Sequence, residues 1–278
     1  MTKDARNMTV VVTGASGRTG SRVARSAEAA GLTVRAASRA RGFDWRDGST
    51  WAGVLRGADA AYLVYPSDIG APGAAEAVGA VAREAVGLGV RRLVLLSSRG
   101  QERARDAEEA LHASGADWTV VRASWFAQNF SEGPLVEELR VSGELVFPAG
   151  EVREPFVDVR DIGDVVVAAL VAGDRYTGET ISVSGPRPLT FGEAVAEIAR
   201  ATGRGLTYRA VSPQRYGENL LGFGVPAREV EALVEAFTQL LDGRNAYLSD
   251  GVRQVLGREA RDFTEFAREA AAAGTWKA

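Results

Sequence analysis

The segment that decides the fold reads Val10-Val11-Val12-Thr13-Gly14-Ala15-Ser16-Gly17-Arg18-Thr19-Gly20. A β-branched run ends at a turn with three regularly spaced glycines, and a helical pattern of small apolar residues follows as far as Gly31. In such a turn the first glycine lets the strand turn sharply. The second removes the side chain that would keep a phosphate from the backbone N–H groups, and the third lets the helix lie close to the strand.

The amides of this turn and the positive end of the following helix together form a potential anion site. We therefore expect a dinucleotide pyrophosphate to bind there, and the simpler alternative is a tight strand–helix turn without a ligand. The expected cofactor contacts in this turn are Gly14, Ser16, Gly17, Arg18 and Thr19.

A second predicted strand, over residues 33–37, ends at Ser38-Arg39. In a dinucleotide-binding fold this end faces the adenosine ribose, where an acidic residue favours NAD and an arginine pairs with the 2′-phosphate of NADP. The chain has Ser38, Arg39 and then Arg41 here, and no acidic residue. The sequence thus predicts NADP(H), although an arginine in a solvated loop would look the same.

The composition of the 278 residues is that of an ordinary globular protein, with 46% hydrophobic and 25% charged residues. A net charge of −3 gives no reason to expect nucleic-acid binding. The absence of cysteine excludes disulfides and thiol nucleophiles, and a single histidine, His112, cannot build a multi-histidine metal site. The polar first seven residues lack the apolar core of a signal peptide, and no apolar run is long enough to span a membrane. We expect a cytoplasmic protein without a metal, nucleic-acid or membrane partner.

Three further strands are predicted at 60–64, 92–96 and 118–122, separated by helical patterns over 74–86 and about 103–113. The strands are nearly continuous apolar runs, as expected of parallel strands covered on both faces. This alternation predicts an α/β fold, a Rossmann-type doubly wound parallel sheet. A short edge strand is also expected at Phe43-Asp44-Trp45.

The pattern changes at Trp125, where an aromatic-rich segment directly follows a core strand. Short extended pieces are expected at 145–148 and 155–159, a helix around 162–170 and a strand at 180–183. The pair Thr190 and Glu193 has the spacing of a capping box, and the chain beyond about residue 205 is expected to be mostly helical. We predict an NADP-binding core over 8–124, with 161–184 packing back onto it. Residues 125–160 and 185–278 would form a smaller, mostly helical substrate lobe.

Several of these segments together resemble the NmrA-like branch of the atypical short-chain dehydrogenase/reductases. They are the glycine turn, Ser38-Arg39, Leu95-Leu96-Ser97-Ser98, the stretch from Ser114 to Arg122, Trp125-Phe126-Ala127-Gln128-Asn129-Phe130, and Pro155-Phe156-Val157-Asp158-Val159-Arg160-Asp161-Ile162. The most specific piece combines Arg122 with Phe126-Ala127-Gln128-Asn129; the family usually has a proline after this arginine, where the chain has Ala123. Relatives within this family include NADPH-dependent type 2 quinone oxidoreductases and bacterial proteins similar to the festuclavine and agroclavine dehydrogenases.

The resemblance implies NADP binding through the glycine turn and Arg39, with the nicotinamide near Val64-Tyr65, Ser97 and Phe126. It does not imply ordinary alcohol dehydrogenation. Typical short-chain dehydrogenases use a Tyr-x-x-x-Lys pair to exchange a proton with a carbonyl substrate. The chain has neither tyrosine nor lysine between Ser98 and Trp118.

A quinone, an imine or iminium, or an enone is already electrophilic, so that positioning against the nicotinamide supplies much of the catalysis. The sequence therefore predicts an NADPH-dependent reductase of an aromatic or polycyclic small molecule, acting as a monomer or homodimer. Tyr65 is the candidate proton donor. The candidate substrate pocket consists of Trp125, Phe126, Asn129, Phe130 and Phe147, although about half of such aromatic residues would serve packing alone.

Two alternatives stay open. One is a non-catalytic NADP(H)-sensing regulatory protein, which the missing Tyr–Lys pair favours. The other is an isomerase or epimerase that recycles its hydride.

Overall fold

The computed structural model describes residues 8–66 and 68–277, and contacts divide them into two compact units. The first unit contains the chain up to Ala123 together with Val159–Val183 and Asp250–Arg258. The second contains Ser124–Asp158, Ser184–Ser249 and the described residues from Glu259 onward. The sequence pattern grouped 250–258 with the lobe, but two contacts hold this segment in the first unit. Gly251 lies directly against the carbonyl of Ser182, and Arg258 forms an ion pair with Asp161.

The first unit is built on a six-stranded sheet in which every neighbouring pair of strands is parallel. The spatial order is β2-β1-β3-β4-β5-β8. The strands are β1 (Thr9–Thr13), β2 (Thr33–Ala37), β3 (Ala60–Leu63), β4 (Arg92–Ser98), β5 (Asp117–Ala123) and β8 (Glu179–Val183). Because the strand order reverses between β1 and β3, a crevice for a ligand is expected at their carboxyl ends.

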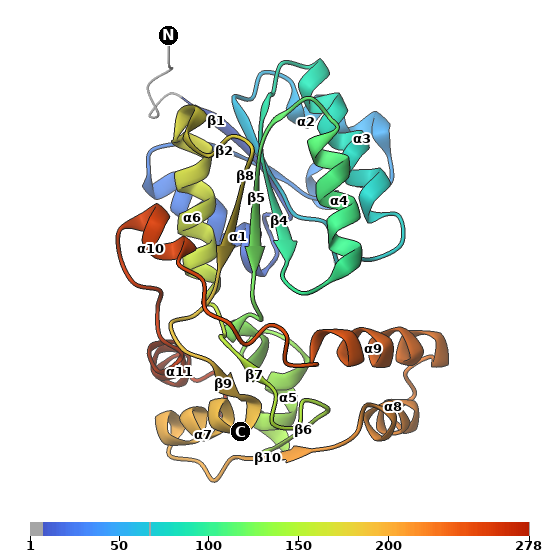
Figure 1. Cartoon of the computed structure of the whole chain (residues 1–278), viewed down its shortest axis with the longest axis vertical. Helices are drawn as coiled ribbons and strands as arrows, with labels where there is room; N and C mark the ends of the chain where they lie inside the picture. The colour runs from blue at the N-terminus through green and yellow to red at the C-terminus, as the bar shows by residue number, and fades with distance from the viewer. Residues whose placement is uncertain (1–7, 67, 278) are drawn as a thin grey trace. The chain divides into compact units, whose positions relative to one another are not determined.

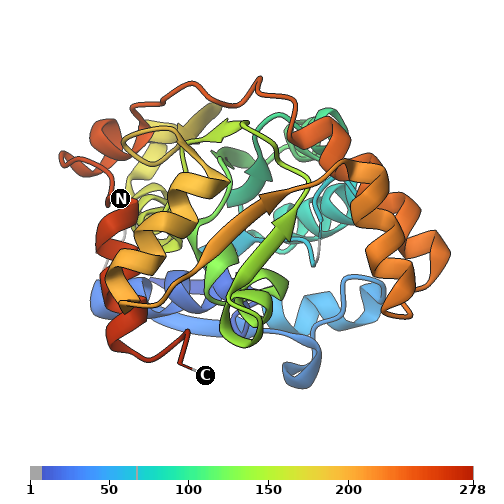
Figure 2. The same ribbon diagram turned by 90° about the horizontal axis from the view of Figure 1, so that it is seen from below.

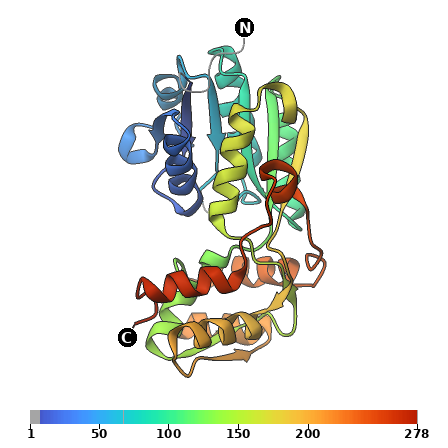
Figure 3. The same ribbon diagram turned by 90° about the vertical axis from the view of Figure 1, so that its left-hand side faces the viewer.

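Helices cover both faces of this sheet, which confirms the predicted Rossmann-type architecture (Figure 1). Helices α1 (Arg18–Ala29) and α6 (Val159–Val171) lie side by side on one face (Figure 3). The other face carries α2 (Trp51–Leu55), α3 (Ala74–Gly87) and α4 (Glu102–His112). Helix α10 (Gly251–Leu256) packs against α6.

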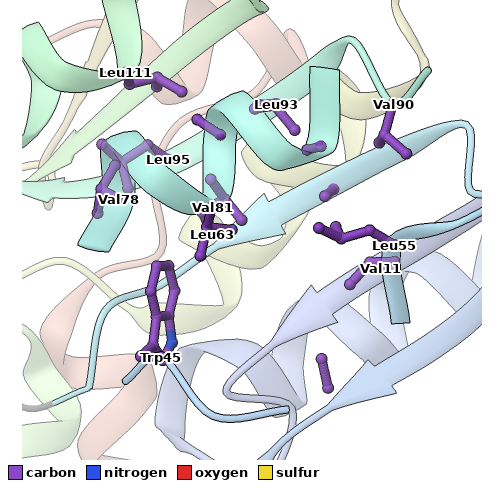
Figure 4. Close-up of a cluster of buried hydrophobic side chains, with 14 of the residues drawn as sticks. Val11, Trp45, Leu55, Leu63, Val78, Val81, Val90, Leu93, Leu95 and Leu111 are labelled. Atoms are coloured by element: carbon purple, nitrogen blue, oxygen red, sulfur yellow. The ribbon is translucent and has the colours of Figure 1, made fainter. Parts of the chain in front are cut away.

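The core under α2, α3 and α4 consists of aliphatic side chains from the strands and the helices (Figure 4). Val11, Leu63 and Leu95 on the strands meet Val78 and Val81 of α3, and all five are fully buried. This core also explains why the edge strand expected at 43–45 is wrong. Trp45 is only 8% exposed and belongs to the same core, so that burial of its ring, rather than strand pairing, fixes this segment.

The described residues of the second unit form two small two-stranded sheets and five α-helices. Figure 2 shows this unit from below. Strand β6 (Glu144–Phe147) is parallel to β10 (Thr207–Ala210), and β7 (Arg153–Glu154) is antiparallel to β9 (Leu189–Thr190). The helices are α5 (Pro134–Val141), α7 (Phe191–Thr202), α8 (Pro213–Gly222), α9 (Ala227–Leu240) and α11 (Phe263–Ala272). The lobe is therefore mostly helical, as predicted.

Two expectations for this unit need correction. The extended piece expected over 155–159 is reduced to a single bridge at Val157, because α6 already begins at Val159. Strand β10 occupies a region expected to be helical, since its short, largely exposed sequence shows no strand alternation and pairing with β6 alone defines it.

The predicted capping box at the start of α7 is confirmed. Thr190 Oγ1 accepts from the N–H of Glu193, and the Glu193 carboxylate accepts from the N–H of Thr190. Arg187 joins α7 to α11, because its guanidinium donates to both Asp262 and Glu197 at 2.7 Å. Among the described helices, none is long and apolar enough to cross a membrane.

Candidate functional site

The three glycines of the N-terminal turn have distinct structural requirements. Gly14 has φ +59°, a left-handed conformation that other residues rarely adopt. A Cβ on Gly20 would lie 2.2 Å from the carbonyl oxygen of Gly14, so that only glycine lets α1 approach the turn. The N–H of Gly17 donates to the Gly14 carbonyl at 2.8 Å and closes the turn. These contacts match the roles expected for Gly14 and Gly20.

The N-terminus of α1 is suited to an anion. Its N-cap residue, Gly17, gives no side-chain cap, and its first turn contains no acidic residue. The first amides of a helix have no partner within the helix and carry its positive dipole end. Ser16, Gly17 and Arg18 are exposed, so that a phosphate can approach them, whereas Thr19 is buried.

The side chains that fix this turn on the sheet were missed by the sequence reasoning. Thr13 Oγ1 accepts from the N–H of Val64 at 2.8 Å and donates to the carbonyl of Tyr62 at 3.1 Å. The fully buried Tyr62 in turn donates its hydroxyl to Thr19 Oγ1 at 3.2 Å, and burial raises the Tyr62 pKa well above its usual range. The carboxyl ends of β1 and β3 and the start of α1 are thus joined. The only feature of the sequence that could have indicated these hydrogen bonds is the threonine at the end of β1. No rule of residue spacing connects Thr13 with β3.

Ser38 and Arg39 lie beside the glycine turn. The pairing of Thr13 with Ala37 brings Ser38, the next residue, next to Gly14. Arg39 is exposed, and within 8–66 and 68–277 no hydrogen bond or ion pair engages its guanidinium. An exposed arginine without a competing carboxylate is available for a phosphate.

Val64 and Tyr65 follow β3, the strand next to β1. Val64 lies so close to the turn that its Cγ1 would be 2.7 Å from a Cβ on Gly14. Tyr65 is half-buried, and its ring packs edge-on against Trp45 with the centroids 5.4 Å apart. Its hydroxyl forms no hydrogen bond with any residue in the described part of the chain, so that a substrate could receive a proton from it.

Ser97, at the carboxyl end of β4, is engaged by a buried ion pair. Its Oγ donates to Glu108 at 2.5 Å, and Glu108 is also bound by Arg122 of β5 through Nε, at 2.8 Å, and a terminal nitrogen. Glu108 is 2% exposed and lies on α4. The ion pair fixes the Ser97 hydroxyl as a donor toward Glu108, which leaves it only an acceptor role toward a cofactor.

The structure thus brings the glycine turn, Ser38-Arg39 and Val64-Tyr65 to the carboxyl ends of three adjacent strands, β1, β2 and β3. Ser97 lies at the end of the next strand. Their assignment to the cofactor remains a prediction, and this grouping is the one a dinucleotide site requires.

The predicted substrate residues lie in the second unit and differ in burial. Phe130 is fully buried, with its ring 5.3 Å from that of Phe156, and Phe147 is 1% exposed. Both have the surroundings of core residues. Trp125, Phe126 and Asn129 are half-buried and keep part of their surface available to a ligand.

Two curated relatives are similar to nearly the whole chain. The NAD(P)H azoreductase of Xenophilus azovorans is 30% identical, over 95% of this chain and 98% of that protein. The (4-alkanoyl-5-oxo-2,5-dihydrofuran-3-yl)methyl phosphate reductase of Streptomyces griseus is 31% identical, over 95% and 98%.

Among solved structures, an NADPH-dependent quinone oxidoreductase from Escherichia coli, complexed with NADPH, superposes with a TM-score of 0.76 at 19% identity. The match covers 94% of this chain and 99% of that one. The model of the NmrA-like family matches residues 105–267, more than half of the chain. The chain therefore belongs to the NmrA-like family, as the motifs from the glycine turn to residue 162 predicted.

Proposed function

We propose that the chain is an NADPH-dependent reductase that transfers hydride to an electrophilic small molecule: a quinone, an imine or iminium, or an enone. The observation that carries the cofactor preference is Arg39, exposed and without an acidic partner beside the glycine turn. The azoreductase that resembles this chain is named for NAD(P)H, and the similar quinone oxidoreductase was crystallised with NADPH.

In this proposal the amides at the start of α1 hold the pyrophosphate, and Ser38 and Arg39 hold the 2′-phosphate. Val64 and Tyr65 lie along the nicotinamide side of the site. Ser97, oriented by Glu108, accepts a hydrogen bond from a cofactor hydroxyl or carboxamide. The bound NADPH supplies the hydride, and the chain supplies position.

The proposed substrate class follows from what the site lacks as well as from what it contains. No tyrosine–lysine pair is available between Ser98 and Trp118 to polarise a simple ketone. The related enzymes are named for azo compounds, quinones and an oxo-dihydrofuran phosphate, whose unsaturated bonds can accept a hydride. In this chain the aromatic residues Trp125 and Phe126 would provide flat apolar surface for such a molecule. We place this reaction in the cytoplasm, with Tyr65 as the candidate proton donor.

The test is NADPH oxidation, followed as the loss of absorbance at the nicotinamide band, with matched panels of quinones, cyclic imines and enones. We expect acceptor-dependent oxidation with at least one panel, and slower oxidation when NADH replaces NADPH. Simple secondary ketones serve as the control panel and should give none. Tight NADPH binding without turnover on any acceptor would refute the reductase.

Such a result would favour the NADP(H)-sensing protein, for which the missing Tyr–Lys pair is the specific observation. The sensor then predicts a co-purifying protein whose retention depends on NADPH. Turnover of a substrate without net loss of NADPH would instead indicate the hydride-recycling isomerase or epimerase.

A further inference from the structure

Four aromatic rings in the second unit form one connected cluster: Trp125, Phe147, Tyr216 and Phe237. Phe147 contacts the rings of Trp125, Tyr216 and Phe237, with centroids 6.1, 5.5 and 5.0 Å away. Phe237 also contacts Trp125 at 6.1 Å and Tyr216 at 5.9 Å. Trp125 and Tyr216 therefore flank the same two phenylalanines, although 90 residues separate them in the chain.

This cluster contains two polar groups without a hydrogen-bond partner among the described residues, and the Trp125 indole nitrogen is the buried one. The indole nitrogen of Trp125 is buried and has no hydrogen-bond partner among the described residues. Tyr216 is 8% exposed, and its hydroxyl likewise bonds to nothing in the part of the chain that the structure describes. A buried donor without a partner costs about 1–3 kcal/mol, so that the orphaned indole N–H of Trp125 in this aromatic cluster needs an explanation.

Both atoms are donors. An indole N–H cannot accept a hydrogen bond. Burial, followed by the nearby charge of Glu138, raises the pKa of Tyr216 to about 12, and the hydroxyl therefore remains protonated at neutral pH. The group that satisfies the Trp125 N–H must therefore be an acceptor, and the protonated Tyr216 hydroxyl is able to donate to an acceptor as well. The negative charge of Glu138 disfavours an anionic acceptor at Tyr216 and favours a neutral one.

We propose that Trp125 Nε1 and Tyr216 Oη are substrate-recognition donors that select a flat aromatic molecule with a neutral acceptor atom, a carbonyl oxygen or an azo nitrogen. The rings of Trp125 and Phe237, both half-buried, provide the apolar faces for the aromatic part. This inference rests on the proposed function and narrows its substrate class. It adds Tyr216, which the sequence reasoning missed, to the residues that determine specificity.

The test compares two ligands that share a ring system and differ in acceptor atoms. Menadione has two carbonyl groups, and 2-methylnaphthalene has none. Binding is measured on the full chain with saturating NADP⁺, which cannot donate hydride, by ¹⁵N-detected indole N–H resonances. The Trp125 resonance is assigned by its disappearance in Trp125→Phe.

We expect menadione to shift the Trp125 indole resonance more strongly than 2-methylnaphthalene does. Tyr216→Phe should weaken menadione binding about 2- to 13-fold, the factor that one neutral hydrogen bond contributes, and leave 2-methylnaphthalene binding unchanged. Tyr247→Phe, which alters a tyrosine that is 55% exposed in the same unit, is the matched control and should change neither affinity. A Tyr216→Phe protein that weakens both ligands equally, or neither, refutes the proposal, as does an unmoved Trp125 resonance.

Failure of this proposal is distinguishable from failure of the proposed function. The ligand-dependent effect of Tyr216→Phe is measured without turnover and stands even if NADPH oxidation is never observed. Conversely, the protein could oxidise NADPH with quinones while Tyr216→Phe affects the binding of menadione and 2-methylnaphthalene equally. That result would support the reductase and reject the role of Trp125 and Tyr216 as recognition donors. Circular dichroism and thermal unfolding of Tyr216→Phe establish that the variant is folded.

Discussion

Substituting Gly20 by alanine tests whether the closeness of α1 to the glycine turn is what creates the cofactor site. The added Cβ would lie 2.2 Å from the Gly14 carbonyl oxygen, 2.6 Å from its carbonyl carbon and 2.9 Å from the carbonyl oxygen of Thr13. All three atoms belong to the backbone, so that no rotamer change relieves the clash. The helix and the turn must separate by roughly 1 Å, because closely packed interiors cannot absorb such an overlap.

The expected effect is larger on binding than on stability. Overpacking of this kind costs about 1–3 kcal/mol, and alanine returns about 1 kcal/mol of helix propensity. A displacement of ~1 Å lengthens the amide–phosphate hydrogen bonds beyond their working range, so that NADPH affinity should fall at least about 10-fold. Isothermal titration calorimetry gives the affinity, and urea unfolding gives the free energy of unfolding.

Gly53→Ala is the matched control. Gly53 lies in helix α2, and a Cβ there would meet nothing within 4 Å. This substitution should stabilise the protein by up to about 1 kcal/mol through helix propensity and leave NADPH affinity unchanged. If folded Gly20→Ala binds NADPH within about twofold of the unmodified protein, the glycine turn is not the phosphate site and the assignment of Gly14 to Thr19 fails.

Four further outcomes are expected. Arg39→Ala should weaken NADPH by ~10- to 100-fold and NADH by less than about twofold, because one charge-assisted phosphate contact is lost; equal losses in a calorimetric titration would remove Arg39 from the site. Tyr65→Phe should lower kcat for an imine by about 100-fold or more if the hydroxyl donates the proton, and an unchanged kcat would assign protonation to solvent. Arg122→Met should reduce the free energy of unfolding at pH 7 by about 3–5 kcal/mol, since it leaves a buried carboxylate without this arginine, and a loss below 1 kcal/mol in urea unfolding would contradict that role. The pKa of Asp262 is lowered from 3.8 to about 2, chiefly by its hydrogen bond from Arg187, so its contribution is complete above about pH 4 and lost as the pH falls toward 2. Because this carboxylate is partly exposed, Asp262→Asn should lower the free energy of unfolding by only ~1 kcal/mol at pH 7. The two proteins should become equally stable as the pH falls toward 2.

The cofactor half of the molecule could be predicted from sequence because its information is local. The turn, the helix that follows it and the residues after β2 each occupy a few consecutive positions. The positive φ of Gly14 and the contacts that require glycine at position 20 also lie within the turn and the end of β1. Parallel strands then bring their carboxyl ends together without any further specification. The network of Thr13, Tyr62 and Thr19 escaped prediction because its bonds join residues 43 to 51 positions apart.

Ser97 shows that a residue's position at the end of a strand can be predicted although the partner of its side chain is not. The family resemblance predicted that Ser97 lies near the nicotinamide, at the end of a strand. In the structure its hydroxyl donates to the buried Glu108, which Arg122 also binds. That ion pair joins α4 to β5, and its members lie 14 residues apart without a periodic pattern to link them.

The second unit depends on long-range packing to a much greater degree. Trp125, Tyr216 and Phe237 come from segments that no local rule connects, and all three rings pack against the buried Phe147. Strand β10, close in sequence to Tyr216, escaped prediction for the same reason, since pairing with β6 defines it.

The two units thus differ in which ligands they can distinguish. In the proposed site, backbone amides and Arg39 would recognise phosphates that every NADPH molecule carries, whereas substrate choice would require side chains that differ among proteins of the same fold. If Trp125 and Tyr216 determine substrate choice, Trp125→Phe and Tyr216→Phe should change which acceptor is reduced and leave the affinity for NADPH constant. A change in acceptor preference accompanied by a change in NADPH affinity would show that these residues act on cofactor binding instead.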